Sequence, residues 1–333
     1  MKKNSIKILD CTLRDGGYLN NWEFGQKTIG SIISNLAKSG IDYIECGFLK
    51  EDSYNPNKTF FFNIEDLEKI ITPNQIYTLM VNLGEYDIKN FSRCHDKNIK
   101  IRVAFKKHNQ SEAIDYIRKL RDLGWDVFAN PMSTNTYSKL ELKNLIMELN
   151  DIKPLGVTIV DTLGNMYEND VIDIFKSIDD ILDKDIALGF HSHNSLQLSF
   201  SNAKALLNQN IERNLIIDSC LYGMGRGAGN LCTELIIKYL NDISGSNYKI
   251  LPVLKSIEED LKPIYKTSSW GYSTPYYIAA IHSCHPNYAA YLVKQNFSDE
   301  IIGKILSNIP EEKKLLYDES LVKDIANQIF SSV

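Results

Sequence analysis

Short runs of apolar and β-branched residues recur at regular intervals up to about residue 246, and a helical pattern follows each run. Such alternation is typical of parallel β/α units. The runs predict eight strands, at Ile6–Asp10, Tyr43–Phe48, Ile76–Asn82, Ile99–Phe105, Asp126–Asn130, Gly156–Asp161, Ala187–His193 and Leu215–Leu221. Eight strands, each followed by a helix, are what a closed (β/α)8 TIM barrel requires. We expect this fold, and an open doubly wound sheet is the alternative.

The pattern changes after residue 246. The pattern of the remaining chain predicts helices separated by polar loops and prolines, and it contains no further alternation typical of strands. We therefore predict a TIM-barrel catalytic domain at residues 1–246 and a helical C-terminal subdomain at residues 247–333. An aromatic-rich segment, Trp270–Tyr277, lies near the centre of this second part.

Composition narrows the classes of partner. The net charge of −5 gives no electrostatic reason to expect nucleic acid or an anionic membrane as a partner. No apolar run approaches the roughly 20 residues that span a bilayer. The six cysteines are scattered and form no Cys-x-x-Cys pair, so we expect free thiols and a reduced, cytoplasmic setting.

A charged pair, Arg14–Asp15, follows the first predicted strand and is itself followed by Gly16 and Gly17. Residues just past the C-terminal end of a barrel strand face the active-site mouth. Two glycines would let the backbone turn sharply at this point. The pair is a candidate for the active site, and an ion pair that caps a turn is the alternative.

Two histidines end the seventh predicted strand. Side chains alternate along a strand, so His191 and His193 point to the same side, into the barrel mouth. Two imidazoles and one carboxylate leave coordination positions open for water and substrate, as a catalytic metal requires. A pair of hydrogen-bonded core histidines is the alternative. Only six histidines occur in the chain, and the presence of two here favours the metal.

A glycine-rich loop, Gly223–Asn230, follows the eighth predicted strand, and a helix begins near Thr233. A strand, such a loop and a helix N-terminus can cradle phosphate. However, no acidic strand end follows about 20 residues later, as a dinucleotide fingerprint requires, and there is no Gly-Lys-Ser/Thr of a phosphate-binding loop. We expect a loop that permits close approach at the mouth, with Asn230 able to reach a metal or its water.

Several further residues lie at the mouth positions of the predicted strands. Each of them alone is more typical of structure than of function. They are Glu45, Arg102, Asn130, Met132, Asp161 and Thr162.

Three motifs together resemble one known family. Thr12–Gly16, His191–His193 and Gly223–Asn230 are similar, in order and spacing, to the motifs of the pyruvate-carboxyltransferase/HMG-CoA-lyase-like metallolyases. The likeness covers residues 6–240. Within that family the chain most resembles the 4-hydroxy-2-oxovalerate aldolases, because His191-x-His193 continues into Leu196-x-Leu198. Gly271–Ser273 also resembles their helical subdomain.

The resemblance implies a divalent ion, Mn2+ or Mg2+, and a set of site residues. The implied metal ligands are Asp15, His191 and His193, with Asn230 as a further ligand. The resemblance implies that Arg14 steadies an enolate, and Tyr18 and Tyr272 are further catalytic candidates that it does not imply. The substrate-binding candidates are Thr162, near the substrate carboxylate, Arg102 and Glu45.

The chain also departs from the family. Tyr18 stands where the aldolases carry a catalytic histidine, and Ser195 stands where they carry asparagine. The proton acceptor is therefore open among Tyr18, a metal-bound water and the tail residues Tyr272, His282 and His285. The Gly-Cys-Pro of the lyase branch is absent from the glycine-rich loop, which argues against an HMG-CoA lyase proper.

The expected function is that of a metal-dependent carbon–carbon lyase. It would cleave or form a bond next to a 2-oxo acid, with an aldehyde as the second reactant. Possible partners are further copies of this chain, in a homo-oligomer, or a partner dehydrogenase. One alternative is a Claisen condensation with an acyl-CoA, of the homocitrate or isopropylmalate synthase type. The other is a metal-bearing binding protein without turnover.

Overall fold

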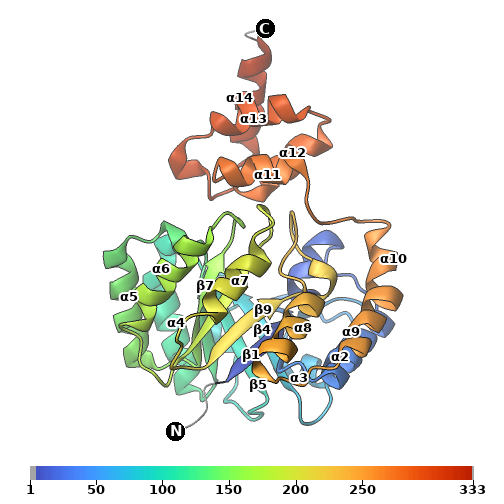
Figure 1. The fold of residues 1–333 in the computed structure, drawn as a ribbon, viewed down its shortest axis with the longest axis vertical. Coiled ribbons are helices and arrows are strands. Elements are labelled where there is room, and N and C mark those ends of the chain that lie inside the picture. Colours follow the sequence, from blue (N-terminus) through green and yellow to red (C-terminus); the bar gives the residue numbers. More distant parts are fainter. Residues whose placement is uncertain (1–4, 332–333) are drawn as a thin grey trace.

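The computed structural model describes residues 5–331, and eight parallel strands in it close into a barrel (Figure 1). The strands are β1 (Ile6–Asp10), β2 (Tyr43–Leu49), β4 (Ile76–Asn82), β5 (Ile99–Phe105), β6 (Val127–Pro131), β7 (Gly156–Asp161), β8 (Ala187–Ser192) and β9 (Leu215–Ser219). Closure follows from β1, which pairs in parallel with both β9 and β2. The predicted (β/α)8 barrel is confirmed, and strand ends differ from the prediction by at most two residues.

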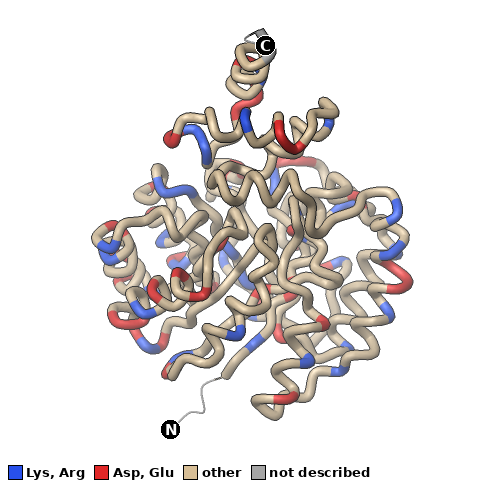
Figure 2. Tube along the Cα trace, turned by 45° about the horizontal axis from the view of Figure 1, so that its top comes forward, with Lys and Arg blue, Asp and Glu red and all other residues tan. Residues whose placement is uncertain are grey.

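Amphipathic helices surround the barrel. They are α2 (Gln26–Ser39), α3 (Ile64–Glu68), α4 (Gln110–Asp122), α5 (Lys139–Ile152), α6 (Glu168–Asp179), α7 (Ser199–Leu207) and α8 (Thr233–Ser244). In α2 the buried residues include Ile29, Ile32, Ile33 and Leu36, whose spacing places them on one face of the helix. Charged residues are distributed along the chain around the barrel, with both signs interspersed (Figure 2).

One β/α unit lacks the expected helix. Between β4 and β5 the chain forms only a 3₁₀ turn, Ile88–Asn90, so the prediction of a helix after every strand is wrong here. The segment is polar and has no apolar spacing of helical period. Two aromatic side chains anchor it instead: the Tyr86 hydroxyl donates to the carbonyl of Phe62 at 2.6 Å, and Phe91 packs against Trp125.

The first helices of the C-terminal part pack on the barrel. α9 (Ile250–Ser256) lies against α2, where Asn35 donates to the Ser256 hydroxyl at 2.9 Å, and α10 (Lys262–Tyr265) follows it. Their apolar residues, together with Trp270, belong to the barrel core. The boundary at residue 247 stays a prediction, because these helices extend the barrel's own packing.

The last helices form a separate core over the C-terminal ends of the barrel strands (Figure 1). They are α11 (Thr274–Ile281), α12 (Pro286–Lys294), α13 (Asp299–Ser307) and α14 (Glu319–Ser331), and we call them the cap. No strand occurs in the cap within the described residues. None of the helices between residues 5 and 331 is both long and apolar enough to cross a membrane. Because it lies over the C-terminal strand ends, the cap covers the end of the barrel at which active sites of this fold lie.

Candidate active site

The turn after β1 brings Arg14 and Asp15 to the barrel mouth. The Asp10 carboxylate fixes this turn, because it accepts hydrogen bonds from the Thr12 backbone N–H at 3.0 Å and the Thr233 hydroxyl at 2.6 Å. A four-residue helix, α1 (Thr12–Asp15), then carries the charged pair.

The two glycines after this pair serve close packing. Gly16 has φ −60°, and neither glycine has a positive φ. The backbone turns here through the 3₁₀ segment Gly16–Leu19 without a left-handed conformation. A Cβ on Gly17 would lie 2.0 Å from the Trp22 ring, and one on Gly16 would lie 2.6 Å from Met224 Sδ.

Asp15, His191 and His193 converge at the mouth and fit a divalent metal. Asp15 Oδ2 lies 3.3 Å from His191 Nε2 and 3.9 Å from His193 Nε2. One ligand atom from each residue lies within 4.8 Å of the others, and all three residues are buried. Neutral imidazoles and a carboxylate are ligands that Mn2+ and related ions accept.

Asn230 adds an oxygen beside this group. Its Nδ2 donates to the Met224 carbonyl at 3.1 Å, which leaves Oδ1 buried and without a hydrogen-bond partner in the described chain. A backbone bridge joins Asn230 to His193. A buried amide oxygen without a donor is costly, and a cation would satisfy it.

The protonation of the two histidines differs in the metal-free protein. Burial lowers the pKa of His193 to about 3, so its imidazole is neutral and keeps a lone pair for a metal. Burial opposes the charged form of His191 as well, but its hydrogen bonds to Asp15 and Asp218 raise its pKa well above the usual value. A proton on His191 thus occupies the place that a metal ion would take.

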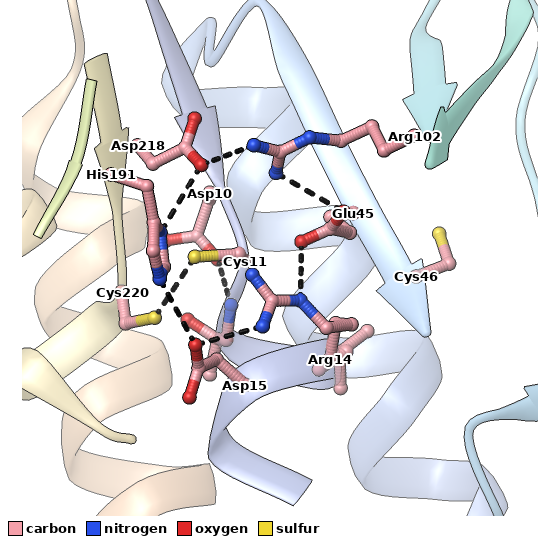
Figure 3. Close-up of polar contacts among 12 residues, drawn as sticks. Asp10, Cys11, Arg14, Asp15, Glu45, Cys46, Arg102, His191, Asp218 and Cys220 are labelled. Carbon is pink, nitrogen blue, oxygen red and sulfur yellow. Dashed lines mark hydrogen bonds and ion pairs between the residues drawn. The ribbon is translucent and has the colours of Figure 1, made fainter. Parts of the chain in front are cut away.

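A closed ring of buried ionic contacts lies beside the metal group (Figure 3). Its six members, in order, are Arg14, Glu45, Arg102, Asp218, His191 and Asp15. Glu45 accepts from Arg14 Nε at 2.7 Å and from Arg102 Nη1 at 3.1 Å. Each charge is compensated by a neighbour, as buried charges require, and the ring holds the metal-site residues in place.

Asp218 is the ring member that the sequence reasoning missed. Its Oδ2 accepts from Arg102 Nη2 at 2.5 Å and lies 3.2 Å from His191 Nδ1. A carboxylate on the second nitrogen fixes the tautomer and orientation of a metal-binding imidazole. The sequence could have indicated Asp218, because an acidic residue inside the apolar run Leu215–Leu221 is costly to bury without a partner.

The cavity beside the metal group, which we call the metal-side cavity, has a volume of about 70 Å³. It is lined by Arg14, Asp15, Tyr18, Phe48, Met80, Asn82, Ala104, Asn130, Met132, Val160, Thr162, His191, His193 and Arg226. The structure therefore brings together Arg14, Tyr18, Thr162 and the metal group, as predicted from their places at strand ends.

Four predicted residues, Glu45, Arg102, Tyr272 and the expected metal ligand Asn230, do not line this cavity. Glu45 and Arg102, expected to bind substrate, lie inside the barrel and are bonded to each other and to the rest of the ring. Tyr272, expected to be catalytic, is 56% exposed, and its ring faces Tyr277 at 6.4 Å. It lies on the segment that leads into the cap and lines neither this cavity nor the larger one next to it.

A second possible ligand group, Cys11 with His191 and Asp218, fits a metal less well. Asp218 Oδ2 is already held by Arg102, and Cys11 is fully buried with its Sγ 3.3 Å from Cys220 Sγ. All six cysteines are free thiols, as expected.

The glycine-rich loop approaches the metal group closely. A Cβ on Gly225 would lie 2.1 Å from Asn230 Nδ2 and 3.3 Å from Asp15 Oδ1, so only glycine fits there. The next residue, Arg226, directs its backbone N–H toward Asp15 Oδ1 at 3.4 Å. Its side chain lines the cavity, and the sequence reasoning did not single it out.

Known proteins are similar to this chain in sequence and in fold. The HMGL-like family model matches residues 5–251. A 4-hydroxy-2-oxovalerate aldolase of Geobacillus genomosp. 3 is 26% identical over 247 residues, which are 72% of either chain. The N-terminal domain of a candidate aldolase from Bacteroides vulgatus superposes with a TM-score of 0.72 at 26% identity, over 86% of this chain and 96% of that one.

An HMG-CoA lyase from Brucella melitensis has the same fold, with a TM-score of 0.60 at 16% identity over 76% of this chain and 96% of that chain. The matched residues 5–251 include the turn after β1, the histidine pair and the glycine-rich loop. The chain therefore belongs to the HMGL-like family of metal-dependent lyases.

Proposed function

We propose that this chain is an aldolase that makes or breaks a carbon–carbon bond next to a 2-oxo acid through its enolate. The observation that carries the proposal is the convergence of Asp15, His191 and His193 beside Arg14 in one small cavity. These residues, with Asn230 Oδ1, would hold Mn2+ or Mg2+. When bound, the ion supplies Lewis-acid polarisation of the substrate carbonyl.

Arg14 is suited to stabilise the enolate oxygen. Glu45 holds its Nε and Asp15 its Nη1, which leaves the Nη2 group for a substrate oxygen. The guanidinium is buried and fixed before the substrate arrives. A fixed positive charge in a site of low polarity stabilises developing negative charge at little reorganisation cost.

Thr162 is suited to bind the substrate carboxylate. Its Oγ1 accepts a hydrogen bond from the Ser133 backbone N–H at 2.7 Å, so the hydroxyl proton is available for donation into the cavity. Asn130, on β6 beside it, lines the same cavity. We propose that Thr162 orients the carboxylate so that the carbonyl faces the metal group.

Tyr18 is suited to act as a neutral hydrogen-bond donor. Burial raises its pKa above the usual value, and the positive charges of Arg226 and Arg14 oppose that shift only in part. A phenol with a raised pKa is a poor base at neutral pH. We therefore assign Tyr18 to substrate positioning or proton donation. Tyr272 lines neither cavity, so we do not propose it as a catalytic residue.

Exchange of the pyruvate methyl protons in D2O, followed by NMR, tests the enolate step without the aldehyde. We expect exchange with Mg2+-loaded protein and its loss in His191→Ala. His95→Ala removes a surface histidine that pairs with Glu68 and serves as the matched control. Absence of exchange with both pyruvate and 2-oxobutyrate would overturn the proposal. Thiol release from acetyl-CoA in their presence would assign the Claisen alternative.

A further inference from the structure

A larger cavity lies between the barrel mouth and the cap. It has a volume of about 1010 Å³ and shares Tyr18, Thr162 and Arg226 with the metal-side cavity, and we call it the outer cavity. The metal-side cavity has room for a small 2-oxo acid. The outer cavity is many times larger, so it has room for a much bulkier second reactant than a two-carbon aldehyde.

Arg226 lies where the two cavities meet, and no acidic side chain of the described residues pairs with it. The buried arginines Arg14, Arg102 and Arg213 each pair with a carboxylate. Within residues 5–331 no carboxylate pairs with Arg226, and its buried Nε has no hydrogen-bond partner. Its guanidinium lies 5.2 Å from the centre of the Tyr18 ring. A half-buried arginine without a counterion is suited to bind an anion.

The contact between Arg226 and His285 also supports an anion-binding site at Arg226. Arg226 Nη1 lies 3.2 Å from His285 Nε2, whereas His285 Nδ1 accepts the Asn287 backbone N–H at 3.2 Å. Burial lowers the pKa of His285 to about 2, so the ring is neutral and its one proton must be on Nε2. Two donors therefore face each other without an acceptor. An oxygen atom of a bound anion would accept from both.

The other charged residues that line the outer cavity are Lys106 and Lys107 and the carboxylates Glu85, Glu141 and Glu312. Lys106 lines the cavity at the end of β5, and no ion pair engages it within the described chain. Of the acidic lining residues, Glu141 pairs with Lys107 at 2.6 Å and Glu85 with Lys50 at 3.8 Å, while Glu312 is the third. His285 also caps the N-terminus of α12, and that end of a helix carries partial positive charge.

We propose that Arg226, His285 and Lys106 bind an oxyanion, a phosphate monoester or a carboxylate, carried by the second reactant. The acceptor would then be an anionic aldehyde whose charged end lies in the outer cavity while its carbonyl reaches the metal-side cavity. This identity of the acceptor rests on the proposed function. The anion site itself rests only on the contacts of Arg226 and His285.

Calorimetric titration with unreactive probes tests the anion site directly. The probes are glycerol 3-phosphate, succinate and, as the neutral counterpart, glycerol. We expect one of the two anions to bind and glycerol not to bind. Arg226→Gln should weaken the binding by about tenfold or more, since a charge-assisted contact is lost, and Arg226→Lys should restore part of it. Lys38→Gln removes an exposed cation of α2 that lines neither cavity, so it should bind as the wild type does.

The same titration in His191→Ala separates this proposal from the proposed function, because that variant lacks a metal ligand but keeps the anion site. Probe binding that survives in His191→Ala supports the anion site even if pyruvate shows no proton exchange. Phosphate binding identifies a phosphorylated acceptor, and succinate binding a carboxylated one. No binding of either anion at about 10 mM, or binding by Arg226→Gln within about twofold of wild type, would overturn the proposal.

Discussion

The Nδ1 atom of His191 lies 3.2 Å from Oδ2 of Asp218, while the Nε2 atom of the same ring faces Asp15 at 3.3 Å. The ring is thus held from both sides. Asp218 belongs to β9 and Asp15 to the turn after β1, so the closure of the barrel between β1 and β9 sets the direction in which His191 presents its Nε2.

Asp218→Asn should weaken metal binding by about 10- to 100-fold, because the amide is a weaker acceptor for the imidazole proton than the carboxylate is. Calorimetric titration with Mn2+ measures the effect. Glu45→Gln is the matched control: it also removes a negative charge from Arg102 but does not touch His191. Equal losses of affinity in the two variants would show that ring charge alone, and not the orientation of His191, controls the metal.

His191→Ala and His193→Ala should each lose the bound divalent ion while the protein stays folded. Both side chains lie at the barrel mouth, where residues contribute to function more than to the core. Metal content by mass spectrometry and secondary structure by circular dichroism are the two measurements. Full metal occupancy in the double variant would disprove the assignment of these ligands.

Arg14→Lys should lower turnover by about 100-fold or more, although the charge is kept. Lysine cannot bond Glu45 and Asp15 and still present a donor to the substrate in a fixed direction. The loss should appear in kcat, because the interaction is made chiefly with the developing enolate. A variant with unchanged kcat and a higher KM would place Arg14 in ground-state binding instead.

Tyr18→Phe should lower turnover without moving the basic limb of the pH–rate profile. The raised pKa of Tyr18 keeps its phenol neutral across the neutral range, so its loss removes a hydrogen-bond donor and no titrating group. Side-by-side profiles of kcat for wild type and variant are the measurement. Disappearance of the basic limb in the variant would identify Tyr18 as the general base.

The free energy of unfolding of Asp10→Asn should rise relative to that of the wild type as the pH rises. Burial raises the pKa of Asp10 to about 6, so the folded state holds its proton more tightly than the unfolded state does. The stability that this proton contributes is complete below the unfolded pKa near 4 and is lost as the pH rises through 6. The variant carries no such proton. Its unfolding free energy, relative to wild type, should rise by about 1 kcal/mol between about pH 5 and 7.5.

Urea denaturation of the metal-free proteins at several pH values measures this difference. The asparagine amide can donate to Thr233, whose hydroxyl then donates to Ser219, so the fold has a way to accommodate the change. A stability difference that stays constant or falls with pH would contradict the assignment of the raised pKa to Asp10.

Local sequence pattern was enough to predict the barrel and its metal group. Strand alternation directs His191 and His193 to one side, and the placement of Asp15 after β1 follows from the rule that strand ends meet at the mouth. Helix prediction failed between β4 and β5, because Tyr86 and Phe91 anchor that segment through contacts with residues distant in the sequence.

Polar residues at strand ends could be placed near the mouth, but their partners could not be chosen. Glu45 and Arg102 were predicted to meet the substrate and are instead engaged by each other and by the ring of buried charges. Asp218 could have been singled out as an acidic residue inside an apolar strand, but its pairing with Arg102 could not be predicted. In a buried site the partner of a charge is decided by which side chains packing brings within hydrogen-bond distance, and that information is not local.

The sequence by itself determined the fold and the place of Arg14, Asp15, His191 and His193 at the barrel mouth, because each depends on the period of a strand or on its order in the chain. Tertiary structure alone decided that Arg226 of the glycine-rich loop meets His285 of the cap across 59 positions of sequence, with two donors face to face. The period of a strand or helix depends on residues that are close in sequence, whereas contacts between a loop and a distant helix form only when the whole chain has packed.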